Sequence, residues 1–277
     1  MNIIKSFFKK YPISILFIAL IIDLCALELV RKQPVIIALI TRLLLALKSY
    51  FLVKLIAGDK VKGYWDIKNA LYVISRLKPF WIFAFVVGSL SFSSFMLVGT
   101  PLIENWFIKF AFYFFFMLSV GLFEEMTFRV VINESILYQF KDDKNVFKYI
   151  SIATVLIFGV VHIIGSDITS FISLATAILK VLSAGLIGLT FMFMFWKKKN
   201  ILGCVLTHAF YDFFSAISTY FFVPGMELKT SYVNDGNVGI VTIIVYLGMI
   251  AWTVYILNRL WKSELKDFDF EKLKDEM

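Results

Sequence analysis

The chain has 277 residues, 60% of them apolar, and a mean hydropathy of +0.83. Soluble globular domains are about 45–50% apolar, so this composition excludes an ordinary soluble protein and predicts an all-α, polytopic membrane protein. The formal net charge of +8 is expected from Lys and Arg in cytoplasmic loops, rather than from a nucleic-acid partner. Cys25 and Cys204 lie far apart in apolar segments and predict neither a disulfide framework nor a zinc knuckle.

Apolar segments of about 20 residues are needed to cross the hydrocarbon of a membrane, and the sequence contains about eight of them. They lie near residues 12–30, 35–57, 79–98, 105–132, 150–165, 171–196, 201–222 and 238–257. The mixed segment 64–78 predicts a short interfacial helix. We therefore expect a single integral membrane domain over residues 1–277, with a charged cytoplasmic tail at 258–277.

The basic residues between these segments predict the orientation of the chain. Lys and Arg are concentrated in the loops on the side of the N-terminus, and only Arg31, Lys32 and Lys229 fall on the opposite side. Because cytoplasmic loops carry the excess of Lys and Arg, both termini are expected in the cytoplasm. Arg42, Lys48 and Lys54, within the second segment, are expected to extend toward lipid headgroups rather than to have a functional role.

Two carboxylates and a guanidinium interrupt the fourth apolar segment, at Glu124, Glu125 and Arg129. A single charged residue at the centre of a membrane helix costs about 2.5–3.5 kcal/mol on insertion scales, so each of the three needs a partner or a function. Glu125 and Arg129 are spaced i, i+4, with the acid first, and are expected to form an ion pair. Glu124 points about 100° away from Glu125 on a helix and requires a partner from another segment.

The two histidines of the chain are the candidates for that partner, because both lie within predicted spans. A single buried histidine is most often a structural residue of the core, but ionisable groups within spans usually mark a site or a pathway. Asp212 follows His208 by one helical turn on the same helix face. Counting at 1.5 Å per residue predicts a similar depth for Glu124, His162 and His208. That depth is roughly 15 Å inside the cytoplasmic boundary, which a polar hairpin tip at 133–148 marks.

These residue types in a low-dielectric cavity suit hydrolysis. A desolvated carboxylate is a better general base, one imidazole can share its proton, and a second imidazole can stabilise an oxyanion. The same side chains could instead hold Zn²⁺, namely Glu124, His162, His208 and Asp212. A mechanism without metal is the preferred hypothesis, because Glu124 cannot readily be both ligand and base and His162 lacks a nearby carboxylate in the sequence. The sequence contains no His-Glu-x-x-His and no Gly-x-Ser-x-Gly motif.

The candidate residues fall into three ordered motifs. These are Glu124-Glu125-x-x-x-Arg129, Phe158-x-x-x-His162 and His208-x-x-x-Asp212. In their order and their intramembrane position, the motifs resemble the signatures of the CAAX-processing and bacteriocin-processing (CPBP) intramembrane proteases, which are relatives of the type II CAAX prenyl endopeptidase. The resemblance covers about residues 105–222.

The resemblance implies an eight-helix core around a catalytic cavity that opens toward the cytoplasm and the membrane. It implies that Glu124, with His162, activates the attacking water. His208 and the residue at position 212 would stabilise the oxyanion. Position 212 is Asn or Asp in the family, and an ionised Asp only accepts hydrogen bonds, so Asp212 would orient His208 here.

Structural support for the site is expected from Glu125, Arg129 and Phe158. The resemblance further implies a bacterial plasma-membrane protein that contacts membrane lipid and acts on a peptide or protein, such as a bacteriocin precursor or a lipidated peptide. Two alternatives stay open, a non-catalytic bacteriocin self-immunity protein on the same fold and a proton-coupled transporter. Transporters tend to have internal repeats and proline-broken helices, and the sequence has neither a visible repeat nor a proline in a motif span.

Overall fold

The computed structural model describes residues 6–8, 10–31, 33–222 and 232–276, which form helices and no strand. The α-helices are α2 (Pro12–Val30), α3 (Val35–Ala57), α4 (Ile67–Leu97), α5 (Trp106–Glu125), α6 (Ile132–Gln139), α7 (Val146–Val161), α8 (Phe171–Lys198), α9 (Ile201–Ser215), α10 (Ile217–Phe222), α11 (Gly236–Leu260) and α12 (Phe270–Glu276). A 3-10 helix covers Gly58–Trp65, and π-helical turns cover Met126–Val131 and Trp261–Leu265. The prediction of an all-α, polytopic membrane protein is confirmed. Lys32 and Lys229, on which the expected orientation partly depends, lie outside the described residues.

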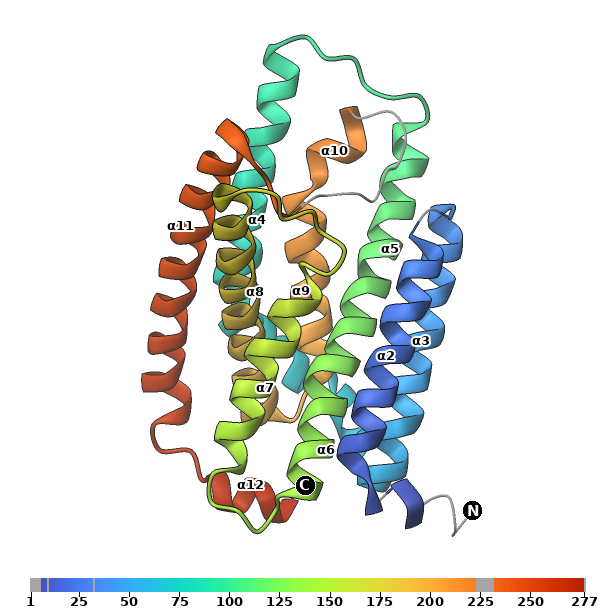
Figure 1. The fold of residues 1–277 in the computed structure, drawn as a ribbon, viewed down its shortest axis with the longest axis vertical. Coiled ribbons are helices and arrows are strands. Elements are labelled where there is room, and N and C mark those ends of the chain that lie inside the picture. The colour runs from blue at the N-terminus through green and yellow to red at the C-terminus, as the bar shows by residue number, and fades with distance from the viewer. Residues whose placement is uncertain (1–5, 9, 32, 223–231, 277) are drawn as a thin grey trace.

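The long helices run back and forth along one axis of the bundle (Figure 1). Six helical segments of the described chain are long and apolar enough to span a membrane, and they are Pro12–Val30, Val35–Ala57, Ile67–Leu97, Trp106–Gln139, Phe171–Lys198 and Gly236–Leu265. The helices α7 and α9 are apolar but shorter. The start of α2, the turn between α6 and α7, and α12 lie at one end of the bundle, which we call the basal end (Figure 1). The assignment of this end to the cytoplasm stays a prediction.

The helix α4 is continuous, and the interfacial helix predicted at 64–78 was wrong. At the start of α4 the Asp66 side chain accepts a hydrogen bond from the Asn69 N–H at 2.7 Å. The helix then continues through Pro79 without a break. Prolines are tolerated in membrane helices because neighbouring groups satisfy the freed backbone. The helix therefore begins well before residue 79, where the predicted span began.

The polar hairpin tip predicted at 133–148 is shorter than expected, because its first residues are buried. Asn133 and Glu134 are 0% and 3% exposed. The Trp196 indole N–H donates to Asn133 Oδ1 at 2.7 Å, and the Tyr64 hydroxyl donates to Glu134 Oε1 at 2.9 Å. Buried polar groups require such partners, and these come from distant parts of the sequence. The exposed part of the hairpin begins at Tyr138, near the end of α6, and includes the turn between α6 and α7.

Two of the three basic residues of α3 that were expected near the headgroups, Arg42 and Lys48, have partners within the bundle, so the prediction was wrong for these two; Lys54 is exposed. Lys48 Nζ lies 2.5 Å from Oδ1 of Asp23, a residue of α2 that is only 2% exposed. The Arg42 guanidinium lies over the Phe116 ring of α5, 4.9 Å from the ring centroid. A buried carboxylate and an aromatic face each favour a cation. Lys48 therefore joins α3 to α2, and Arg42 joins α3 to α5.

Close contact between α5 and α9 brings their polar residues together. A Cβ at Gly121 would lie 2.8 Å from the Val205 carbonyl oxygen, so the two backbones meet where only glycine fits. Small residues permit such close packing of membrane helices. Gly121 precedes Glu125 by one turn, and the contact therefore places the last turn of α5 directly against α9.

Candidate active site

The three sequence motifs meet where α5, α7 and α9 approach one another. Glu124 and Glu125 belong to the last turn of α5, and His208 lies within α9. His162 is the first residue after α7. His208 is the centre of the cluster, because carboxylates from the first and the third motif surround its ring.

Both ring nitrogens of His208 face carboxylates. Nδ1 lies 2.8 Å from Glu125 Oε1. Nε2 lies 3.3 Å from Asp212 Oδ2 and 3.6 Å from Glu124 Oε2. The two nitrogens of a histidine have separate roles, and the partner of one fixes the orientation of the other. The His208 ring is therefore held at Nδ1 and directs Nε2 between Glu124 and Asp212.

The carboxylate that holds His208 is part of a buried layer. Glu125 and Arg129 are both 0% exposed and form the expected ion pair, in which Nη2 donates to Oε1 and Nε lies near Oε2, each at 3.1 Å. The Arg129 guanidinium stacks on the Phe158 ring, 4.2 Å from its centroid. The same ring packs edge-on against His208, with centroids 6.2 Å apart. Glu125, Arg129 and Phe158 thus surround the rear of the imidazole, and the contact between Glu125 and His208 was not predicted.

Glu124 and Asp212 are the accessible acids of the cluster. Their side chains are 21% and 31% exposed, in contrast to the fully buried Glu125. Glu124 Oε2 is itself enclosed, on the side of His208, and accepts no hydrogen bond from any described residue. A carboxylate oxygen with unused lone pairs can accept a hydrogen bond from water or from a substrate. The different environments of the two adjacent glutamates therefore indicate a reactive role for Glu124 and a structural role for Glu125.

His162 ends α7 instead of lying inside a span that continues to residue 165. Its Nδ1 lies 2.6 Å from the Phe158 carbonyl oxygen, and because a carbonyl only accepts, Nδ1 is the donor. In the neutral ring the lone pair is then on Nε2, which can accept a proton. His162 interacts electrostatically with His208 and Asp212. Within the described residues it makes no hydrogen bond to Glu124, so the expected pairing of these two is not direct.

Two cations beside the site were not predicted. Lys180 of α8 interacts electrostatically with Asp212 and Glu124. Arg42 of α3 interacts electrostatically with Glu124. Lys180 is the one charged residue in the predicted span 171–196, and an isolated charge in a span is a signal for a functional site. Arg42 gave no comparable signal, because basic residues near the ends of spans commonly extend to the headgroups.

The side chains considered as zinc ligands do not fit a metal site. Among the described residues, no group of three or more His, Cys, Asp or Glu side chains is arranged so that it could hold a metal ion. Zinc sites in proteins have at least three protein ligands in a tetrahedral arrangement. The Nδ1 atom of His162 is also engaged by a backbone carbonyl. The chemistry proposed below therefore uses protein side chains alone.

Comparison with protein-family models identifies the part of the chain that carries the cluster. Residues 104–214 match the family described as type II CAAX prenyl endopeptidase, Rce1-like. For this segment, the family predicted from the three motifs is confirmed. The Rce1-like segment runs from just before α5 to the end of α9 and includes all the predicted site residues. No curated protein and no solved structure matches the chain.

The Rce1-like segment does not contain every charged group of the site. Arg42 belongs to α3, which lies outside the matched residues, yet it interacts electrostatically with Glu124. The helix α3 therefore contributes to the electrostatics of the candidate site as well as to the bundle.

Proposed function

We propose that this integral membrane protein is an intramembrane endopeptidase that hydrolyses a peptide bond near the cytoplasmic side of the membrane. The observation that carries the proposal is the partly exposed Glu124 carboxylate, 3.6 Å from His208 Nε2, with Asp212 beside the same nitrogen. The match to a family described as an endopeptidase supports the same class of reaction.

In the first step Glu124, with His162, activates a water molecule. Glu124 accepts a proton from the water, and the oxygen attacks the carbonyl carbon of the substrate peptide. The Glu124 side chain suits this role because it is 21% exposed and no described residue donates a hydrogen bond to its carboxylate, although Oε2 itself is enclosed beside His208 Nε2. The available Nε2 of His162 suits a second acceptor that orients the water. These two roles do not require His162 to contact Glu124 directly, because the water molecule can lie between them.

In the second step His208 stabilises the oxyanion that forms on the attacked carbonyl. A ring that donates Nδ1–H to Glu125 and Nε2–H toward the substrate carries a positive charge, which favours a negatively charged oxygen. Asp212 is acceptor-only when ionised, so it positions Nε2–H rather than donating to the oxyanion. The intermediate collapses when the C–N bond breaks and Glu124 returns its proton to the leaving amine.

The substrate is proposed to be a peptide or protein in a bacterial plasma membrane. A bacteriocin precursor and a lipidated peptide are the substrate classes that the motif resemblance favours. A site within the bundle, close to the membrane, suits a substrate that is held at the lipid surface. Both termini of the chain would then lie in the cytoplasm, on the side that carries most of the Lys and Arg residues.

The test uses the full chain in lipid nanodiscs with a library of quenched fluorescent peptides, half of which carry a prenylated cysteine. We expect cleavage by the unmodified protein, with the broken bond identified by mass spectrometry. Glu124→Gln is expected to lower the rate by about 10²-fold or more, because a general base contributes about 10²–10⁴-fold.

Glu104→Gln is the matched control for this experiment. Glu104 is exposed, precedes α5 and is not part of the cluster, so the same chemical change there should leave the rate unaltered. A Glu124→Gln protein as active as Glu104→Gln would remove Glu124 from the mechanism. An intact library after incubation with the unmodified, folded protein would count against an endopeptidase and favour the non-catalytic alternative.

A further inference from the structure

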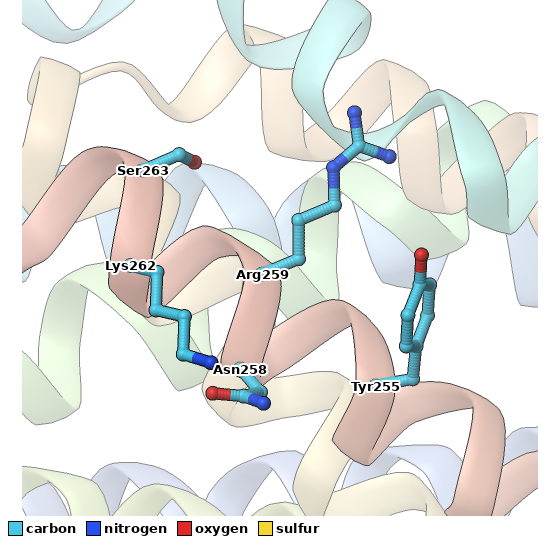
Figure 2. Close-up of a pocket in the computed structure, with 5 residues that line it drawn as sticks. All are labelled: Tyr255, Asn258, Arg259, Lys262 and Ser263. Carbon is cyan, nitrogen blue, oxygen red and sulfur yellow. The ribbon is translucent and has the colours of Figure 1, made fainter.

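We propose that a pocket at the basal end of α11 binds the phosphate group of an anionic phospholipid. The pocket has a volume of about 420 Å³. It is lined by Tyr255, Asn258, Arg259, Lys262 and Ser263 (Figure 2). All five residues lie outside the Rce1-like segment, and the proposal is independent of the proposed peptidase activity.

The lining of this pocket offers hydrogen-bond donors and no carboxylate. Arg259 and Lys262 supply two positive charges, and the Tyr255 and Ser263 hydroxyls and the Asn258 amide supply neutral donors. The Arg259 guanidinium and the Tyr255 hydroxyl extend from the helix in the same direction, whereas the Lys262 side chain extends toward Asn258 (Figure 2). Phosphate oxygens accept strong, charge-assisted hydrogen bonds from guanidinium and ammonium groups. The donor set therefore fits a phosphate better than a cation or a neutral ligand.

The two cations of the pocket are available to a ligand. In the described part of the chain, neither the Arg259 guanidinium nor the Lys262 ammonium forms an ion pair or a hydrogen bond. The neighbouring acid Glu264 is only 6% exposed and is already paired. Arg76 Nε lies 2.9 Å from its Oε1, and the Tyr72 hydroxyl donates to its Oε2 at 2.6 Å. Glu264 therefore does not neutralise the pocket.

The position of the pocket along α11 points to lipid headgroups. The segment Gly236–Leu265 is long and apolar enough to span a membrane, and the pocket lies in its last turns. Tyr255 and Trp261 are 58% and 45% exposed there. Tyr and Trp are enriched where a membrane helix meets the headgroup region. Lys and Arg side chains close to a membrane surface are attracted to anionic headgroups, each contributing about 1 kcal/mol.

The surface of α11 adjacent to the pocket favours a lipid over free phosphate. Leu247 and Val254, which precede the pocket along the helix, are 51% and 48% exposed. Exposed apolar side chains on a membrane helix contact acyl chains. A phospholipid with its phosphate at Arg259 and Lys262 can place its acyl chains along this surface, whereas inorganic phosphate gains nothing from it.

The test is a lipid titration of the detergent-purified full chain, followed by native mass spectrometry. The probes are phosphatidylglycerol, phosphatidylcholine and inorganic phosphate. We expect the unmodified protein to bind phosphatidylglycerol more tightly than phosphatidylcholine. The double variant Arg259→Gln/Lys262→Gln should bind phosphatidylglycerol about 30-fold more weakly, as expected for the loss of two basic residues near a membrane surface.

The matched control is the double variant Lys144→Gln/Lys266→Gln, which removes the same charge from exposed residues outside the pocket. It should keep the affinity for phosphatidylglycerol. An equal loss in both double variants would attribute binding to general surface charge and overturn the proposal. If inorganic phosphate displaced phosphatidylglycerol at equal concentration, the ligand of the pocket would be free phosphate and not a phospholipid, and the proposal would be overturned. Equal melting temperatures of the variants show that the loss of binding does not come from unfolding.

Discussion

His208 Nδ1 lies 2.8 Å from Glu125 Oε1, although the two residues are 83 positions apart in the chain. The same carboxylate pairs with Arg129 on its own helix at 3.1 Å. One fully buried acid therefore holds both a cation of the π-helical turn and an imidazole of α9. Its neighbour Glu124 is partly exposed and faces the opposite nitrogen of the ring. The two adjacent glutamates are thus expected to differ when each is changed.

Glu125→Gln should act on stability, whereas Glu124→Gln should act on catalysis. Loss of the Glu125 charge leaves Arg129 buried without its partner, which is expected to lower the free energy of unfolding by about 3–5 kcal/mol. Glu124→Gln should leave stability nearly unchanged, because that side chain is partly exposed. Thermal unfolding in detergent compares the two variants. A lower melting temperature for Glu124→Gln would mean that the two roles are reversed.

The role of Asp212 as a hydrogen-bond acceptor predicts different results for two substitutions. Asp212→Asn should keep most of the activity, because the amide oxygen can still accept from His208 Nε2–H. Asp212→Leu should lower kcat/KM by about 10-fold or more, since a hydrogen bond to a charged group contributes about 1.5–3 kcal/mol. Steady-state kinetics with the same peptide measures both. An equally large loss in both variants would show that the negative charge itself is required.

The close contact between α5 and α9 predicts that Gly121→Ala impairs the site. The added methyl group would lie 2.8 Å from the Val205 carbonyl oxygen, so the helices must separate and Glu125 must move from His208. Gly248→Ala on α11 is the control, because no atom lies within 4 Å of its added Cβ. That control should be neutral or stabilising by up to about 1 kcal/mol. Melting temperature and kcat/KM are measured for both, and equal effects would exclude a special role of this contact.

The cation of α8 is expected to support the acids of the site. Lys180→Met keeps the length of the side chain but removes the charge that interacts with Asp212 and Glu124. We expect kcat/KM to fall by about 10-fold, equivalent to about 1.4 kcal/mol, and Lys180→Arg to restore most of it. Lys54→Met, at an exposed position of α3, is the control. Unaltered kinetics in Lys180→Met would limit Lys180 to a packing role.

The arrangement of the acids and histidines predicts that activity survives strong chelation. The described residues provide no group of three or more side chains that could hold a metal ion. The measurement combines elemental analysis of the purified protein with the peptide assay before and after chelation. Stoichiometric zinc that is lost together with activity, and restored with it, would contradict this prediction and assign a metal to the site.

The sequence predicted which residues gather at the site better than which atoms meet there. Spacing along one helix is local, so the Glu125–Arg129 ion pair and the contact between His208 and Asp212 could be derived from i, i+4 positions. Helix rotation is set by packing with distant segments, and the contact between Glu125 and His208 therefore had no sequence signal. For the same reason, the sequence did not predict that Asn133 is buried against Trp196, because this contact joins two distant segments.

Fold class was predictable because a membrane permits few backbone arrangements, whereas helix ends were not. The mixed composition of residues 64–78 predicted a separate interfacial helix, and the start of the membrane span was therefore misplaced at residue 79. The true start is a capped turn at Asp66. The position of Lys48 was also predicted wrongly. A basic residue in a span can either extend to the lipid headgroups or pair with a buried acid, and the sequence pattern does not distinguish the two. The buried Asp23 on the adjacent helix decides between them.

The π-helical turn Met126–Val131 lies between α5 and α6 in a helical segment that extends from Trp106 to Gln139. A π turn bonds i to i+5, so it accommodates about one extra residue and rotates α6 by about 100° relative to a regular continuation. The face of α5 that meets His208 and the face of α6 that meets Tyr64 are therefore set independently. A one-residue deletion here would leave length and apolar content almost unaltered, yet it would turn Glu134 away from its partner. The rotation of α6 about the helix axis, relative to α5, is therefore the property that this turn fixes. In homologous chains, an insertion or deletion in this turn should occur only together with compensating changes in α6.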